Sequence, residues 1–467
     1  MLTYLYLGLA YVSSVFVMAD TLSNADVASQ ARGWPKPVPS HEAWKSLPPS
    51  NGDRTDPLPI WARMMVTEMP RTTAAFLELD RAQRTLGAVS AELRAACRFV
   101  AAKANGCEYS MATARLDARA ANTSAAKLAS LEDDSWQAWT GEERLALEFA
   151  KRMATDSDGI PDAMFSELVS KFGDRAAACM VLHSAYANFQ DRFLLCLRIP
   201  TESIDVLPPI VSRFDPTGLV STTTPPPNAN AKSENPSAGT SQSFLQSKRS
   251  EAGVADLTWL PYGELQTRLA QQRRRETRLR IPEWDSIAPN LPSGLMDKPS
   301  DIIWYRIVFG YASELAVPFE IYMRTAGSEV SKNWDRIFGN SIFWIVTDAI
   351  KCPYCMGHCE MNWEVAGLDA SAIAVRSQAL SGSDWSTFSI AEQQALSFAI
   401  KLTKTPSQID LKDIQGLREG FGDQRALFIM LNASRYNYMT RISNGFQLTL
   451  ESENVFWDYY KITPKRK

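Results

Sequence analysis

Residues 140–153 of this chain read TGEERLALEFAKRM, and residues 389–402 read SIAEQQALSFAIKL. In both stretches apolar residues recur at three- and four-residue spacing, which predicts an α-helix with one buried face. Thr140 and Ser389 begin the two stretches, and their hydroxyl groups suit the N-cap position of a helix. The sequence therefore predicts a similar helix twice.

The second stretch belongs to a longer block that repeats the first half of the chain. The pairs that are 249 positions apart include Trp136 and Trp385, Glu143 and Glu392, Phe149 and Phe398, Gly173 and Gly422, Asn188 and Asn437, and Arg192 and Arg441. A second block has a spacing of 245, which places Cys107, Tyr109 and Met111 on Cys352, Tyr354 and Met356. Identities at so constant a spacing predict a tandem duplication.

The other segments of both halves also have helical patterns. Gly173 and Gly422 each follow a short amphipathic segment, at the position where a helix C-terminus favours a left-handed residue. The next segments, residues 176–197 and 426–448, are long and mainly apolar, which is typical of a central buried helix. We find no clear period-two alternation between hairpin turns. The predicted fold class is all-α.

The composition changes between the two copies. Residues 222–227 read TTTPPP, and the residues up to Lys248 are mostly Asn, Ala, Ser, Gly, Gln and Lys, which is typical of a linker. The predicted organisation is a signal-like or wrongly assigned N-terminal segment (1–19), a Pro-rich lead segment (20–55), a first repeat (56–212), a flexible linker (213–252) and a second repeat (253–467).

Length and charge limit the possible partners. With 467 residues and 45% hydrophobic content, the chain is long enough for about two to four domains. A net charge of −3 and a pI near 5.9 give no overall attraction for nucleic acid, so no nucleic-acid partner is expected. The one basic run is interpreted as a solvated helix face, and its residues are Arg273, Arg274, Arg275, Arg278 and Arg280.

The first 19 residues form an uncharged apolar run that ends in Val17, Met18 and Ala19. The run resembles the apolar region and small-residue cleavage site of a signal peptide, although no Lys or Arg precedes it. The second interpretation is that translation begins at Met18, and a third is a short membrane anchor, although the run barely reaches the roughly 20 residues that a span needs. The protein is exported under the first interpretation and cytoplasmic under the second, and the sequence leaves both open.

The residues that carry chemistry lie within one run, CPYCMGHC, from Cys352 to Cys359. The preceding helix is expected to end near Lys351, so that Cys352 becomes N-cap-like and Pro353 takes the first helical position. Cys355 then lies in the first turn, where backbone N–H groups and the helix dipole favour a thiolate over a thiol.

On this helix Cys355, His358 and Cys359 are spaced i, i+3 and i+4, so both later side chains can contact Cys355. His358 could take the proton of Cys355 or stabilise its anion. Cys352 is placed to attack a sulfenic acid on Cys355 and to form a disulfide. The candidate catalytic residues are therefore Cys352, Cys355, His358 and Cys359.

Two plainer interpretations stay open. A structural zinc site would use Cys352 and Cys355 with two further ligands, but one helix cannot surround a metal ion with four ligands. Cysteine is also often a small core residue, so the cluster could consist of buried inert thiols. The same inert state is predicted for the four isolated cysteines, and His183 is interpreted as a satisfied core histidine. We expect neither a metal nor another cofactor.

With its duplicated helical halves and a helix leading into Cys-x-x-Cys near a histidine, the chain resembles the alkylhydroperoxidase D-like and carboxymuconolactone decarboxylase family over residues 56–212 and 290–450. In redox members of that family the second cysteine attacks a peroxide, the first resolves the product, and a histidine and a glutamate relay protons. The resemblance implies that Cys355 is peroxidatic and Cys352 resolving. The tetrapeptide also matches glutaredoxin active sites, which follow a strand, so that match concerns local chemistry alone.

The chain departs from the family pattern at three places. The family has Cys-x-x-Cys-x-x-x-His, whereas here His358 comes one residue early and Cys359 takes the usual position. The relay glutamate would fall on Asn340, so a nearby carboxylate such as Glu360 would have to replace it. In the first half, Ser110 takes the place of the second cysteine, which predicts a degenerate repeat that packs against the active one.

The expected function is thiol-dependent oxidoreduction, with hydroperoxide reduction as the reaction. The expected partners are a small-molecule hydroperoxide, an unidentified thiol or disulfide reductant, and further copies of the chain in a homo-oligomer. Two alternatives come from other classes: a lactone decarboxylase, which does not need a Cys-x-x-Cys pair, and a non-enzymatic metal-binding or interaction module.

Overall fold

The computed structural model describes residues 34–199, 206–215, 219, 261–296, 298–330, 334–382 and 385–462. The predicted segment 1–19 lies outside the described residues, and so do residues 20–33 of the lead segment. The same holds for residues 216–218 and 220–252 of the predicted linker.

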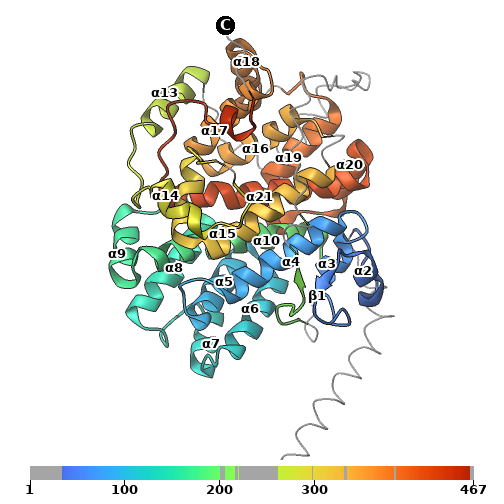
Figure 1. The fold of residues 1–467 in the computed structure, drawn as a ribbon, viewed down its shortest axis with the longest axis vertical. Helices are drawn as coiled ribbons and strands as arrows, with labels where there is room; N and C mark the ends of the chain where they lie inside the picture. Colours follow the sequence, from blue (N-terminus) through green and yellow to red (C-terminus); the bar gives the residue numbers. More distant parts are fainter. Residues whose placement is uncertain are drawn as a thin grey trace, which may run out of the picture.

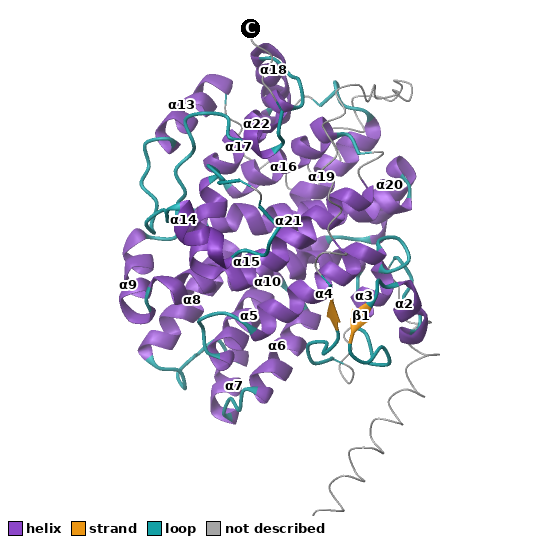
Figure 2. Ribbon diagram, viewed as in Figure 1, coloured by secondary structure: helices purple, strands orange, loops and turns teal. Residues whose placement is uncertain are grey.

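The described chain is mostly helical, which confirms the all-α prediction (Figure 2). Two short segments pair as antiparallel strands, with Ser50 opposite Phe214. The elements of the first half are α2 (Ser40–Ser46), β1 (Ser50–Asn51), α3 (Ile60–Met65), α4 (Pro70–Thr85), α5 (Ala91–Asn105), α6 (Glu108–Ala120), α7 (Ala125–Glu132), α8 (Gly141–Thr155), α9 (Asp162–Phe172), α10 (Asp174–Leu197) and β2 (Arg213–Phe214).

The second half begins with short elements and then follows a similar order of helices. Its elements are α13 (Tyr262–Gln272), α14 (Trp284–Ile287), η2 (Ala288–Asn290), α15 (Ile303–Val330), α16 (Arg336–Ile350), α17 (Pro353–Val365), α18 (Ala370–Ser381), α19 (Ile390–Lys404), η4 (Pro406–Gln408), α20 (Leu411–Phe421), α21 (Asp423–Phe446) and α22 (Phe456–Tyr459).

The local signals for helix ends act as predicted. Thr140 and Ser389 cap α8 and α19, and in each case a glutamate in the first turn bonds back to the cap residue. Gly173 and Gly422 end α9 and α20 with φ of 80° and 76°, which a residue with a Cβ rarely adopts. Both glycines also serve as the N-cap of the long helix that follows.

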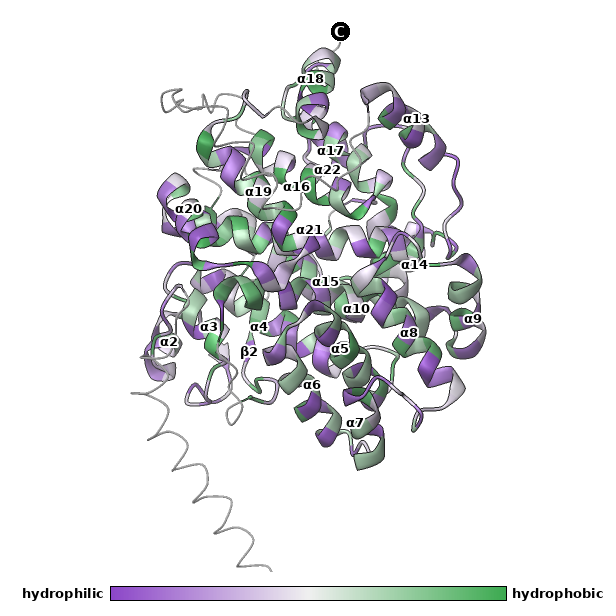
Figure 3. Ribbon diagram, turned by 180° about the vertical axis from the view of Figure 1, so that it is seen from behind, coloured by the Kyte–Doolittle hydropathy of each residue, from purple (hydrophilic) through white to green (hydrophobic). Residues whose placement is uncertain are grey.

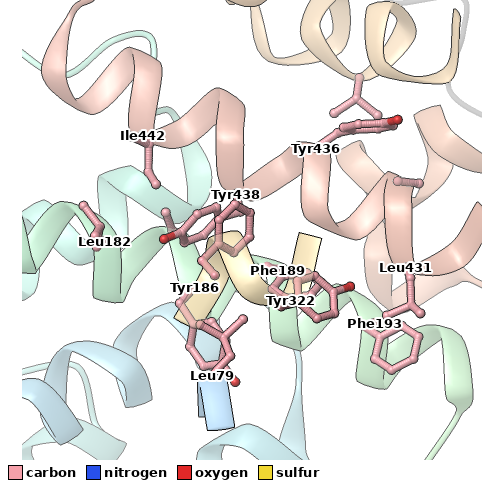
Figure 4. Packing of buried hydrophobic residues seen from close by; sticks show 14 of the residues in the cluster. Leu79, Leu182, Tyr186, Phe189, Phe193, Tyr322, Leu431, Tyr436, Tyr438 and Ile442 are labelled. Carbon is pink, nitrogen blue, oxygen red and sulfur yellow. The ribbon is translucent and has the colours of Figure 1, made fainter. Parts of the chain in front are cut away.

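The long helices α10 and α21 lie side by side at the centre of the molecule, with the first half below them and the second half above in Figure 1. Around this pair, α4 packs against α15 and α15 packs against α10. Figure 4 shows the aromatic side chains of α10, α15 and α21 that fill the contact. The ring centroids of Phe189 and Tyr322 lie 5.5 Å apart, and those of Phe319 and Tyr438 lie 4.1 Å apart. One hydrophobic cluster thus includes residues of both halves.

Two buried arginines connect the halves through equivalent contacts. Arg192 on α10 donates to the carbonyl oxygen of Thr403 at 3.1 Å, and Arg441 on α21 donates to that of Ala154 at 3.2 Å. In each case the guanidinium is also bonded to an asparagine one turn earlier, Asn188 or Asn437. Burial lowers the pKa of Arg192 to about 10 and that of Arg441 well below its usual range. Arg192 and Arg441 are 249 positions apart, and so are Ala154 and Thr403, whose carbonyl groups they reach.

The basic run differs from the predicted solvated helix face. The helix α13 ends at Gln272, so the five arginines follow it instead of forming one of its faces. Arg278 is buried at its side chain and donates to Asp162 and to the carbonyl oxygens of Ile160 and Gly445. That arginine therefore joins the two halves, because a buried guanidinium needs several acceptors.

In the part of the chain that the structure describes, no helix combines the length and the apolar composition needed to cross a membrane.

Candidate redox site at the start of α17

The turn before α17 sets the position of the thiols. Lys351 ends α16 in the left-handed conformation, with φ of 59°. Its N–H donates to the carbonyl oxygen of Asp348, and the N–H of Cys352 donates to that of Thr347 at 2.9 Å. These two bonds satisfy two of the last four carbonyl groups of α16 where the chain turns into the next helix. The predicted break near Lys351 is confirmed.

The four candidate residues occupy the first two turns of α17. Cys352 is the N-cap residue and Pro353 takes the first helical position, as predicted. Cys355 lies in the first turn, and His358 and Cys359 follow one turn later. The helix is surrounded by α13, α16, α18, α21 and α22, so most of its residues are buried and none is exposed.

The prediction that Cys355 is held as a thiolate is wrong for this arrangement. Cys352 and Cys359 are fully buried and Cys355 is 2% exposed. Burial raises the pKa of Cys355 well above its usual range, and hydrogen bonding with Cys352 raises it further. Removing the thiolate from water outweighs the attraction of the helix N-terminus, which is worth about 1 kcal/mol.

Cys355 contacts two side chains that bear on its reactivity. Its Sγ lies 3.3 Å from Oγ of Ser443 on α21, and hydrogen bonding of that hydroxyl to the thiolate lowers the thiol pKa in part. The Cys352 thiol is close enough to hydrogen-bond with it, as the predicted resolving role requires. Both cysteines are free thiols.

His358 forms a hydrogen bond with a residue that was not among the predicted site residues. Nε2 of His358 lies 2.7 Å from Oε2 of Glu451, which follows α21. The other oxygen of Glu451 accepts from the N–H of Ile303 at 2.7 Å and from the hydroxyl of Tyr354 at 3.0 Å. Burial alone would raise the pKa of Glu451, but His358 and the N–H of Ile303 hold that pKa below its usual range.

Close packing holds this pair in place. The His358 ring packs against Tyr354, with centroids 4.2 Å apart, and against Phe456 on α22, whose ring is nearly perpendicular to it at 4.9 Å. Leu450 packs directly on Gly357, where an added Cβ would lie 2.4 Å from the leucine side chain. The glycine thus allows the segment after α21 to approach α17, and this approach brings Glu451 to His358.

Two further expectations about the proton relay concern Asn340 and Glu360. Asn340 donates from Nδ2 to the carbonyl oxygen of Cys359 at 2.6 Å, so its amide supports the helix backbone. Glu360 accepts from Gln266 and Ser377, which belong to α13 and α18. The carboxylate that contacts the candidate histidine is therefore Glu451 and not Glu360. Cys359 is buried, and burial raises its thiol pKa well above the usual range.

One signal in the sequence could have identified Glu451. The dipeptide Glu-Ser at residues 202–203 recurs at residues 451–452, again 249 positions later. The glutamate therefore belongs to the repeated register, just after the long central helix. Tyr354 and its counterpart Tyr109 were part of the predicted register, but their role in the site depends on contacts with distant segments.

The corresponding place in the first half has a similar backbone and different chemistry. Gly106 takes the left-handed position there, and Cys107 precedes α6 as Cys352 precedes α17. Sγ of Cys107 donates to Oγ of Ser110 at 3.4 Å. Ser110 also bonds to Asp191, a fully buried carboxyl group whose pKa is raised by burial to about 6. This half has one thiol where the other has two.

His183 and the four isolated cysteines are all buried. His183 is buried and its Nδ1 lies 3.0 Å from Oε1 of Gln83, but its Nε2 has no hydrogen-bond partner among the described residues. Burial lowers its pKa to about 3. The interpretation of His183 as a core histidine is confirmed, but only one of its two ring nitrogens has a hydrogen-bond partner among the described residues. Burial of the four isolated cysteines is also confirmed, and they are Cys97, Cys107, Cys179 and Cys196.

Within the described ranges, no three His, Cys, Asp or Glu side chains are arranged to hold a metal ion together. Neither protein-family models nor curated proteins give a match to this sequence.

Proposed function

We propose that this chain is a thiol-dependent oxidoreductase that reduces hydroperoxides through Cys355 and Cys352. One observation carries the proposal: two free thiols in hydrogen-bonding contact lie at the start of α17, one helical turn from a histidine bonded to a carboxylate. The resemblance to the alkylhydroperoxidase D-like family supports the same reaction, with Glu451 taking the part of the relay glutamate.

The reaction takes place in two steps. The sulfur of Cys355 attacks the terminal oxygen of the hydroperoxide, the O–O bond breaks, and an alcohol leaves with a proton from the site. Cys355 is then a sulfenic acid. The sulfur of Cys352 attacks it, a disulfide forms, and water leaves. Two thiols are oxidised for each hydroperoxide that is reduced, and an external dithiol or two monothiols restore the pair.

Because burial opposes ionisation of Cys355, the proposal requires the site to open before reaction. The cover over the histidine is the short helix α22, whose Phe456 lies against the His358 ring. We infer that displacement of α22 admits the hydroperoxide and water. The His358–Glu451 pair then accepts the Cys355 proton, because the Glu451 carboxylate lies against the imidazolium that results.

We also propose that the fold is a tandem duplication. Six helices of the first half, α5 to α10, have counterparts in the same order in α16 to α21. In five of the six pairs the two helices are equally long, with 15, 13, 15, 11 and 24 residues. The exchanged contacts of Arg192 and Arg441 also support this proposal, because two related units packed around a local two-fold axis make each contact twice.

The function is tested by counting thiols. One equivalent of hydroperoxide added to the reduced chain should consume two thiols and give a Cys352–Cys355 disulfide, identified by mass spectrometry of the digested protein. The matched control is Cys107→Ser, which removes a thiol from the first half and should leave the stoichiometry unchanged. No oxidation of Cys355 at any hydroperoxide concentration that leaves the chain folded contradicts the proposal.

Burial of the three thiols favours a second candidate, in which they are core residues of a non-enzymatic protein. In that case Cys355→Ala should destabilise the fold through a small cavity, and hydroperoxide should oxidise no thiol faster than it does in the unfolded chain. The thiol count therefore separates the two candidates.

A further inference from the structure

A pocket of about 440 Å³ opens at the N-terminal end of α17. Its lining comes from the end of α13, the turn that follows, and the first residue of α17. The lining residues are Arg268, Gln271, Gln272, Arg274, Arg275 and Pro353. None of the six is acidic, and α13, which carries three of them, is largely hydrophilic (Figure 3).

The cations of this pocket have only partial neutralisation. Arg268 is paired with Glu264 at 3.3 Å, on the same exposed face of α13. For Arg274 we find no ion pair within the described ranges, and its side chain is exposed. Arg275 contacts the side-chain oxygen of Gln447 when that amide is oriented to satisfy its neighbours. The pocket therefore offers guanidinium groups that water solvates.

Carboxylates lie near these cations without lining the pocket. Asp158 interacts with Arg275, Arg268 and Lys351, and burial nevertheless holds its pKa above the usual range. Asp348, close to Arg268 and Lys404, has a pKa raised by burial to about 7. Because burial favours the protonated form of both, they neutralise the arginines less than two exposed carboxylates would.

The helix itself adds to the positive potential. Pro353 is the first residue of α17, so the unpaired N–H groups of the first turn and the positive end of the helix dipole lie at this end of the helix. Exposed cations together with a helix N-terminus favour binding of an anionic group. Pro353 directly follows Cys352, so a bound group would lie at the start of the helix that carries the thiol pair.

We propose that this pocket binds a carboxylate carried by one of the two reactants of the thiol site, the hydroperoxide or the reducing thiol. The reaction depends on the proposed function, whereas binding of the carboxylate depends on the pocket alone. Arg274 and Arg275 contact the carboxylate and position the reactive end of the molecule toward Cys352 and Cys355.

The kinetic test uses matched neutral and charged reactants. Cumene hydroperoxide is compared with its ring-carboxylated analogue, with 2-mercaptoethanol as reductant. Then 3-mercaptopropionate replaces 2-mercaptoethanol, with neutral cumene hydroperoxide. In the double variant Arg274→Gln/Arg275→Gln, kcat/KM for one carboxylated reactant should fall about tenfold, because two charge-assisted contacts are lost. Values for the neutral pair should stay within about twofold. The control is Arg273→Gln, the same charge change at a residue that does not line the pocket.

The two arms identify the source of the carboxylate. A loss confined to the carboxylated hydroperoxide assigns the pocket to the substrate, and a loss confined to mercaptopropionate assigns it to the reductant. An unchanged ratio of charged to neutral kcat/KM for both reactants overturns the proposal, and so does an equal loss in Arg273→Gln.

A binding measurement keeps the pocket testable if the chain turns over no hydroperoxide. Calorimetric titration of the reduced full chain should detect binding of benzoate and not of benzamide, and the double variant should bind benzoate about tenfold more weakly. Equal binding of benzoate by the wild type and the double variant contradicts the pocket. Absence of turnover with retained benzoate binding contradicts the proposed function alone.

Discussion

The starts of α6 and α17 have similar backbones and different side chains. In both, a left-handed residue ends the preceding helix and a cysteine takes the N-cap position. At α17 a second thiol and a histidine follow in the next turns, and Glu451 contacts that histidine. At α6, Ser110 replaces the second thiol and bonds to Asp191. The left-handed turn thus positions the first cysteine in both places, whereas the chemistry depends on the side chains in the first two turns of the helix that follows.

Substitution of the thiols should give the largest difference between the two starts. Cys355→Ser makes α17 resemble α6, and we expect turnover of hydroperoxide to fall by a factor of about 10³ or more, because a hydroxyl is a far weaker nucleophile than a thiol. Cys107→Ser should change turnover by less than about twofold. The measurement is steady-state hydroperoxide consumption. Full activity in Cys355→Ser would show that Cys355 does not carry the reaction.

The two buried arginines test whether the halves depend on each other equally. Arg441→Met removes the donor to the carbonyl oxygens of Met153 and Ala154. We expect a loss of about 3 kcal/mol in the free energy of unfolding, because buried acceptors are left without partners. Arg192→Met should have a similar effect. Urea unfolding measures both.

The control for the arginine variants is Arg152→Met on α8. Its ion pair with Glu148 is about one-third exposed on both sides, so its loss should cost less than about 0.5 kcal/mol. If one central arginine proved as tolerant as Arg152, the contacts would not be energetically equivalent.

Asp191 should give the first half a distinct response to pH. Its folded pKa, about 6, lies above the usual value of 3.8, so its contribution to stability is complete below pH 3.8 and is lost as pH rises through 6. Asp191→Asn should therefore stabilise the chain by about 3 kcal/mol at pH 8 and change little at pH 4. Unfolding by urea at a series of pH values measures this. The same gain at pH 4 and pH 8 would contradict the assignment.

Glu451 should give the second half the opposite response. Its folded pKa lies below the usual value of 4.5, so its contribution is present above pH 4.5 and is lost as pH falls through the folded pKa. Glu451→Gln should lower stability by about 1 kcal/mol at neutral pH, because charge-assisted hydrogen bonds become neutral ones. Below that window the variant and the wild type should converge. Glu360→Gln is the control, since its carboxyl contacts α13 and α18 instead.

The local features of the fold could be predicted from the sequence because each depends on a few neighbouring residues. The caps Thr140 and Ser389 and the turn at Lys351 need no distant partner. The helix α15 was not predicted as a separate element. It contains Pro318 and a non-helical residue, Ala312, so local propensity would place a break inside it. Packing against α4 and α10 accounts for its length.

The sequence predicts where the candidate site lies along the chain, but not which residues surround it. The order of Cys352, Cys355 and His358 follows from the chain and the helix period. Burial of the thiols depends on α13, α21 and α22, which come from distant parts of the sequence. Glu451 lies 93 positions after His358 and reaches it because Leu450 fits against Gly357. A thiolate inferred from the helix dipole alone was therefore wrong, since desolvation is decided by those distant segments.

The exchanged arginine contacts have a consequence for how small this protein can be made. Each guanidinium is held by carbonyl groups of the opposite half, so neither half contains all the acceptors for its own central cation. A fragment that kept only the thiol-bearing half would expose Arg441 and the apolar surface around it. We expect such a fragment to aggregate or to pair with a second copy of itself. The smallest folding unit is then the joined pair, and the candidate site at the start of α17 depends on both halves.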